Sequence, residues 1–217
     1  MTDAYPIDCS YDEVTSLITG RCHLLCRPAN CFADETAMQF DPRFDPATTL
    51  WKAATGGYEC QCRYGTGSSN LWVRETWATF HPATESPDIV RGITYRAGFD
   101  VKFIPKLEPD MGCFVGGRNS PWQAGIIMPR RNSRLTLTGV RIRCRRVQDL
   151  DQYDVMATMD AIESVNGGYA AVRHCTPVYD TPLTAFKAVW DKRYGKGAYD
   201  RNGFTWFISF GRILLTT

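Results

Sequence analysis

The chain has 217 residues, of which 44% are hydrophobic and 22% charged, and its formal net charge is +2. A chain of this length suits one domain, and its apolar content, ordinary for a globular protein, is sufficient to build a core. Because this net charge is close to zero, it does not indicate nucleic-acid binding. Only a local cluster of cations can support that function.

The first 20 residues predict the cellular compartment. They are polar and acidic, without the apolar run of a secretory signal, and no window of the sequence reaches the length of a membrane span. We therefore expect a cytoplasmic protein that makes no membrane contact and keeps its nine cysteines reduced. The glycine-rich run GCFVGGR at 112–118 does not lie between a strand and a helix, and no cofactor is predicted.

Residues 10–19 predict an N-terminal helix. Its apolar residues recur at the i, i+3, i+4 spacing of one helix face. Ser10 and Glu13 have the spacing of a capping box, and Gly20 is placed to end the helix.

The middle of the chain alternates irregular segments with strands. The stretches at about 28–68 and 99–121 are rich in turn residues and predict long irregular insertions. Between them, aromatic and β-branched residues alternate with polar ones, which predicts strands at 71–80 and 92–98.

The segment 133–150 is the most informative part of the sequence. Apolar residues alternate there with threonine and arginine, which predicts a long strand with one apolar face. Gly139 interrupts the alternation, as a bulge or kink would. The opposite face carries Arg141, Arg143 and Arg145.

Two helices and a strand complete the prediction. Residues 150–165 and 181–195 have helical periodicity, and residues 203–215 form an aromatic-rich strand. This order of elements predicts an α+β fold in a single domain over 1–217. We expect a mixed or antiparallel sheet that closes on itself as a small barrel.

A cluster of arginines is the strongest functional signal. Seven of the 25 basic residues fall within the 20 positions from 128 to 147. Arginine forks bind phosphate oxygens in pairs, and nearby tryptophans can stack on bases. The alternative is a solvated strand face whose arginines pair with the chain's 23 carboxylates. The seven arginines are Arg130, Arg131, Arg134, Arg141, Arg143, Arg145 and Arg146.

Soft metal ligands form a second cluster near the N-terminus. Its members are Cys22, His23, Cys26, Cys31, Cys60 and Cys62. They supply enough donors for a tetrahedral zinc, but none of the cysteine pairs has the C-x2-C spacing typical of zinc sites. The alternative is a set of buried or free cysteines, and no metal is predicted.

Several stretches occur together in an order that resembles one protein family. They are LWVRETWATF at 71–80, TYRAG at 94–98, MPRRNSRLTLTGVRIRCRRVQDLDQYD at 128–154, FKAVWDKRYGK at 186–196 and WFISFGRI at 206–213. DEVTSLITGRCHLLCRP at 12–28 is similar to the family's helix ending in G-R-K-T-x-T-R-R. Together they resemble phage and prophage proteins with an ASCH domain, in the PUA-like superfamily. The resemblance implies a small β-barrel with flanking helices, in a protein of the bacterial host's cytoplasm.

The resemblance also implies where a catalytic site would lie. One branch of the family hydrolyses N4-acylated cytidines with a lysine, a threonine and a glutamate, and these positions correspond here to Cys22, Leu25 and Thr158. A thiol cannot replace a lysine base without changing the chemistry, and leucine can neither attack nor donate a proton. The amidohydrolase activity of that branch is therefore not expected.

The predicted function is non-catalytic binding of nucleic acid or of a nucleotide-like ligand in the groove beside the basic strand. Two alternatives stay open: a phage protein that inhibits a host defence or replication factor through the irregular insertions, and an enzyme that acts on a modified nucleoside. The predicted binding residues are Arg130, Arg131 and Arg134 for phosphates, Ser133 for a hydrogen bond, Trp72, Trp77 and Trp122 for stacking, and Arg74 with Glu75 beside them.

Overall fold

A computed structural model provides the coordinates. It describes residues 4–29, 42–46, 48–52, 59–80, 92–97, 122–158, 162–165, 167–171 and 178–215. The predicted insertion at 99–121 lies outside the described residues. None of the described helices is long and apolar enough to cross a membrane.

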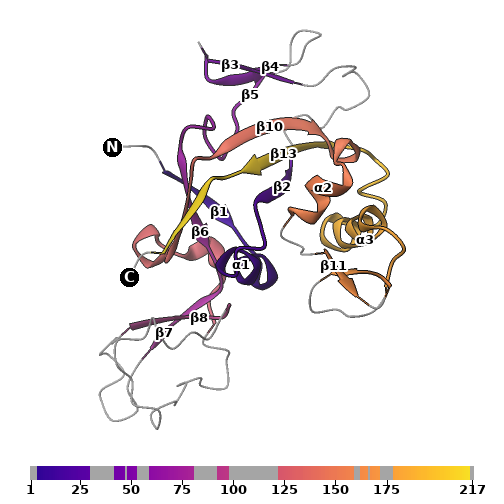
Figure 1. Ribbon diagram of the computed structural model, residues 1–217. Coiled ribbons are helices and arrows are strands. Elements are labelled where there is room, and N and C mark those ends of the chain that lie inside the picture. Colours follow the sequence, from indigo (N-terminus) through magenta and orange to yellow (C-terminus); the bar gives the residue numbers. More distant parts are fainter. Residues whose placement is uncertain are drawn as a thin grey trace.

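Two sheets form the body of the molecule (Figure 1). In the first, β1 pairs in parallel with β6, and the remaining neighbours of the order β1–β6–β9–β14 are antiparallel. The second is antiparallel throughout, in the order β10–β13–β2. The strands are β1 (Ala4–Asp8), β2 (Leu24–Pro28), β6 (Asn70–Arg74), β9 (Leu135–Thr138), β10 (Arg141–Arg146), β13 (Phe204–Ser209) and β14 (Arg212–Leu215).

One bent pair of strands joins the two sheets. The predicted strand at 133–150 is divided into β9 and β10, and the one at 203–215 into β13 and β14. Gly139 has φ +64° at the first bend, and a Cβ there would lie 3.4 Å from the backbone nitrogen of Gly211 at the second. Glycine at these two positions therefore allows the β9–β10 bend and the β13–β14 bend to lie directly against each other. The two joined sheets curve around the core (Figure 1), but the described strands form two open sheets and not the closed barrel that we expected.

The main core lies inside this curve, under α1 (Tyr11–Ile18). Ile7, Leu71, Leu137 and Ile208 come from four different strands and are fully buried there, together with Val14 of the helix. Burial of each such side chain contributes roughly 1.5–3 kcal/mol. The predicted capping box of α1 is confirmed, because Ser10 and Glu13 bond each other's backbone nitrogens.

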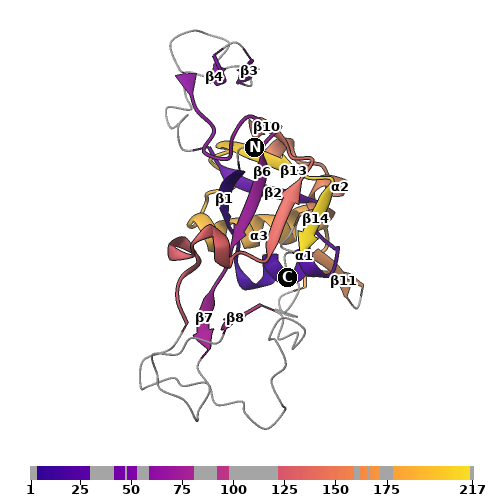
Figure 2. The same cartoon turned by 90° about the vertical axis from the view of Figure 1, so that its left-hand side faces the viewer.

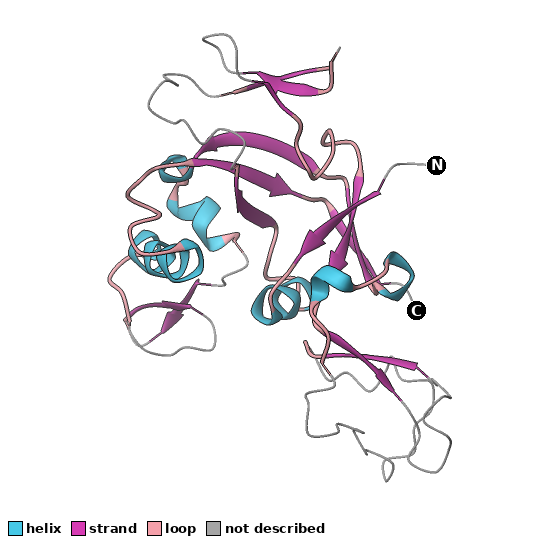
Figure 3. Cartoon of the chain, turned by 180° about the vertical axis from the view of Figure 1, so that it is seen from behind, coloured by secondary structure: helices cyan, strands magenta, loops and turns pink. Residues whose placement is uncertain are grey.

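A second core lies on the outer face of the β10–β13–β2 sheet, under α2 (Gln152–Met156) and α3 (Pro182–Tyr194), as Figure 3 shows from behind. Helix α3 matches its prediction, with Thr181 as the cap. The prediction of one helix over 150–165 is wrong, since α2 ends at Met156. The next residues bond β2 instead, where Leu24 donates its N–H to Ala157, and the chain continues into a hairpin of β11 (Ile162–Val165) and β12 (Gly168–Ala171).

Two small sheets project from opposite ends of the body (Figure 2). One contains three short strands within the segment that we expected to be irregular. The other is a hairpin, which forms because the predicted strand at 71–80 breaks after Arg74. The first is β3 (Arg43–Asp45), β4 (Leu50–Lys52) and β5 (Glu59–Cys60), and the second is β7 (Trp77–Phe80) with β8 (Gly92–Tyr95).

Candidate nucleic-acid interface

The outer row of arginines on β10 is exposed, as the sequence predicts. Arg141, Arg143 and Arg145 are solvent-exposed, whereas Ile142 and Cys144 between them pack toward the main core. Alternate residues of a strand are about 6.7 Å apart, so the three guanidinium groups form an evenly spaced row. Among the carboxylates that the structure describes, none forms an ion pair with this row.

A groove of about 500 Å³ begins where the arginine row begins. Arg141 and Ser209 supply its polar side chains, and Ser209 donates a hydrogen bond to the Arg141 carbonyl at 3.5 Å. A Cβ on Gly67 would lie 3.4 Å from the backbone nitrogen of Ile142, so the loop around Gly67 runs directly against β10. The lining residues are Gly67, Gly139, Val140, Arg141, Ser209, Phe210 and Gly211. The glycines leave backbone groups accessible to a ligand.

Arg134 and Glu75 must be removed from the predicted binding surface. The Arg134 guanidinium donates to both carboxylate oxygens of Glu75, at 2.9 and 2.8 Å, and lies over the Tyr95 ring at 4.4 Å. The two residues are only 3% and 1% exposed. Burial raises the pKa of Glu75, against the lowering effect of Arg134. This pair is an internal support at the base of the β7–β8 hairpin, and it offers no free donor to a phosphate.

Three more predicted residues have structural contacts of their own. Arg74 pairs with Asp8 at 2.6 Å. The Ser133 hydroxyl oxygen lies 2.8 Å from the Val73 carbonyl and 3.0 Å from the Leu135 carbonyl, so its single O–H is engaged within the fold. Trp77 is buried, which excludes it from stacking on a base.

The remaining predicted residues keep partial or full exposure. Trp72 and Trp122 are half-buried, and Arg130 and Arg131 are exposed on a short 3-10 turn that precedes β9. The structure therefore gathers the predicted residues around the junction of β6, β7 and β9, at the other end of β9 from the row on β10. Most of those side chains serve the fold.

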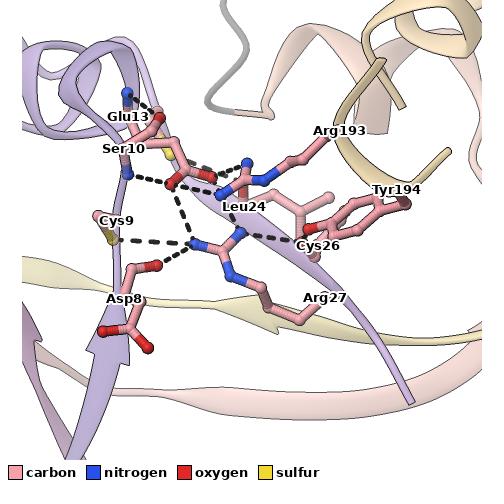
Figure 4. A network of polar contacts seen from close by, with 10 residues as sticks. Asp8, Cys9, Ser10, Glu13, Leu24, Cys26, Arg27, Arg193 and Tyr194 are labelled. Carbon is pink, nitrogen blue, oxygen red and sulfur yellow. Dashed lines mark hydrogen bonds and ion pairs between the residues drawn. The ribbon is translucent and has the colours of Figure 1, made fainter. Parts of the chain in front are cut away.

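A buried charge cluster that our sequence analysis missed lies on the helix side of β2 (Figure 4). The Glu13 carboxylate accepts hydrogen bonds from Arg27 at 2.9 and 3.2 Å. It also accepts two from Arg193 of α3 and one from the Ser10 backbone at 2.6 Å. Burial alone would raise the pKa of Glu13, but Arg27 and Arg193 outweigh it and lower the pKa to about 2. The carboxylate is therefore ionised at neutral pH.

This cluster joins elements that are distant in sequence. Arg27 also donates to the Asp8 carbonyl at 2.7 Å, so it links the end of β1 to β2, while Arg193 links both to α3. Beside the cluster is a cavity of about 10 Å³, close to the space that one water molecule needs. Two features of the sequence point to this cluster: the capping-box position of Glu13, and Arg27 after a run of apolar residues. Arg193 gives no such signal, because a cation at the end of a helix is usually exposed.

The three positions that the resemblance implies as catalytic are buried. Cys22 and Leu25 are fully buried in the main core, and burial raises the pKa of the Cys22 thiol. Thr158 is buried beside the small cavity, and its hydroxyl donates to the Val155 carbonyl at 2.7 Å. Neither a base nor an exposed nucleophile stands at these positions.

The cysteines and the histidine that could hold a metal are dispersed. Cys22 and Cys26 belong to the two different cores, and His23 between them is exposed. Cys60 is disulfide-bonded, which corrects the expectation that every cysteine is reduced. Cys31 lies outside the described residues. Within the described ranges, no three histidine, cysteine or acidic side chains are grouped as ligands.

Searches against protein-family models, curated proteins and solved structures found no match to this chain.

Proposed function

We propose that this protein binds nucleic acid through its phosphate backbone, with Arg141, Arg143 and Arg145 as the principal contacts, and does not catalyse its turnover. The observation that carries the proposal is the row itself. Three exposed arginines with no described carboxylate in ion-pair range stand on β10, which forms one end of the β10–β13–β2 sheet. Guanidinium groups in that state are available for charge-assisted hydrogen bonds to phosphate.

The groove beside Arg141 supports the same function. Its glycine-lined wall allows a ligand to approach backbone groups closely, and the Ser209 hydroxyl adds a neutral donor or acceptor. The hydroxyls of Thr66 and Ser68 lie in the adjoining loop, 3.2 Å from each other. Neutral contacts of this kind fix the register of a nucleic acid that the arginines attract.

The resemblance to ASCH proteins of the PUA-like superfamily is part of the proposal. It agrees with an α+β chain whose curved sheet carries helices on its outer face. A non-catalytic role is favoured by the burial of Cys22 and Leu25 at the positions where a hydrolytic relative would hold its base and its threonine.

The test is fluorescence anisotropy with labelled single-stranded and double-stranded DNA and RNA, over a salt series. The logarithm of the association constant should fall with the logarithm of salt at a slope of about −2 for a single strand held by three phosphate contacts. Replacement of all three arginines of the row by glutamine should remove most of that slope.

Two control variants separate the row from general charge. Replacing Lys192, Lys196 and Arg201 by glutamine removes the same charge from exposed positions around the end of α3 and should change the slope little. Replacing Arg130 and Arg131 tests the turn that the sequence favoured, and its effect should be the smaller of the two arginine sets. Binding that is absent at micromolar protein, or that all variants weaken equally, would contradict the proposal.

A further inference from the structure

Strand β14 is an exposed edge. Within the described part of the chain it pairs only with β9, and it forms one end of the four-stranded sheet. The unpaired side of an edge strand presents backbone N–H and C=O groups that can pair with another extended segment. Leu214 and Leu215 on this strand are 50% and 52% exposed, which is unusual for two neighbouring leucines.

An apolar groove of about 260 Å³ runs beside this edge. One wall is the end of α1, with Leu17 and Ile18, and the other wall is β14, with Ile213 and Leu215. The last two are two residues apart, so their side chains lie on the same face of the strand. Leu214 points to the opposite face and does not line the groove.

The charged residue of the groove is a cation. Arg212 lines the groove and is exposed, as is His23, and no acidic residue is among its described lining residues. A segment that entered with an apolar side chain would therefore meet a cation beside it. A carboxylate on that segment would be favoured, and an amine would be disfavoured.

We propose that β14 and this groove bind an extended acidic segment of a partner protein, which adds to the sheet as a further strand. Its backbone pairs with the β14 edge, an apolar side chain fills the space between α1 and Leu215, and a neighbouring carboxylate pairs with Arg212. This surface is separate from the arginine row, so its failure would leave the proposed nucleic-acid binding intact.

A displayed library of short random peptides, selected on the full-length chain, tests the proposal. Enriched sequences should alternate apolar and acidic residues. Leu215→Asn should weaken their binding about tenfold, as the loss of one buried leucine contact predicts. Leu214→Asn is the matched control, because it removes an equally exposed leucine from the other face of the same strand, and it should change binding less than about twofold. Arg212→Glu should abolish selection for acidic residues.

Three outcomes would overturn the inference: no enriched sequence, equal losses in the two asparagine variants, or unchanged binding in Arg212→Glu. The inference would also be overturned if the groove beside β14 were filled by a second copy of the chain. In that case analytical ultracentrifugation would show a dimer that Leu215→Asn dissociates, and the proposed partner segment would be rejected. Equal thermal midpoints of the two asparagine variants would establish that folding does not explain their difference.

Discussion

Removal of the charge of Glu13 should destabilise the protein strongly at neutral pH. In Glu13→Gln the guanidinium groups of Arg27 and Arg193 lose the anion between them and face each other. Arg27 has almost no contact with water, and its side chain is 8% exposed. Loss of one partner from a buried ion pair costs about 3–5 kcal/mol. A loss of this size is a large part of the 5–15 kcal/mol typical of the free energy of unfolding.

The same ion pairs also make the stability depend on pH. Folding lowers the pKa of Glu13 from its ordinary value of 4.5 to about 2. At 1.36 kcal/mol per pKa unit, this difference corresponds to about 3 kcal/mol. Because the folded pKa is the lower one, the contribution is fully present above pH 4.5 and is lost as the pH falls toward 2.

Urea unfolding followed by tryptophan fluorescence, between pH 7 and pH 2.5, measures both effects. The wild-type chain should lose stability over the acid range, and Glu13→Gln should be less stable at pH 7 with a flatter acid profile. Asp200→Asn is the control, since its pair with Lys187 is exposed and contributes at most about 1 kcal/mol. A cost below about 1 kcal/mol for Glu13→Gln, or an unchanged acid profile, would refute the assignment of Glu13 as the anion that holds the buried Arg27 and the partly exposed Arg193.

Two further predictions concern the fold around the candidate surface. Glu75→Gln leaves the Arg134 guanidinium buried without its anion and should lower the free energy of unfolding, measured with urea, by about 3–5 kcal/mol. A double variant with leucine at positions 75 and 134 should recover part of that loss. A double variant no more stable than Glu75→Gln would contradict this prediction. Gly139→Ala places a Cβ on a residue with φ +64° and should cost about 1–2 kcal/mol in the same assay. Gly211→Ala should cost less, because its Cβ would meet only the Thr138 carbonyl at 3.8 Å.

Local patterns in the sequence predict much of this fold. The capping box of α1, the limits of α3 and the alternation of Ile142 and Cys144 with arginines all follow from short-range chemistry, and the structure confirms them. The false helix over 150–165 shows the limit of such patterns. Its first turn forms with Asp151 as the cap, but the following residues pair with β2, and that tertiary contact has no local signal.

The candidate site is less predictable, because the sequence shows which residues are charged but not which residues they contact. Arg134 and Arg143 are both arginines in the same basic stretch. One lies over the Tyr95 ring and donates through its Nε and one terminal nitrogen to Glu75, and the other is exposed on β10. The strand pattern distinguishes them only when the break between β9 and β10 is known, since Arg134 precedes the first strand and Arg143 lies within the second.

The separation of these two kinds of arginine bears directly on the proposed function. Arg27 and Arg193 share the buried carboxylate of Glu13, and Arg134 holds that of Glu75, so two of these three positive charges are balanced inside the protein. The row on β10 has no such carboxylate among the described residues, so its field reaches solvent although the net charge of the chain is only +2. A nearly neutral protein can therefore present a cationic edge, because its acidic partners for the other arginines are used in the interior. This distribution of charge requires that the salt dependence of nucleic-acid binding be set by the three exposed arginines of the row and not by the total number of arginines.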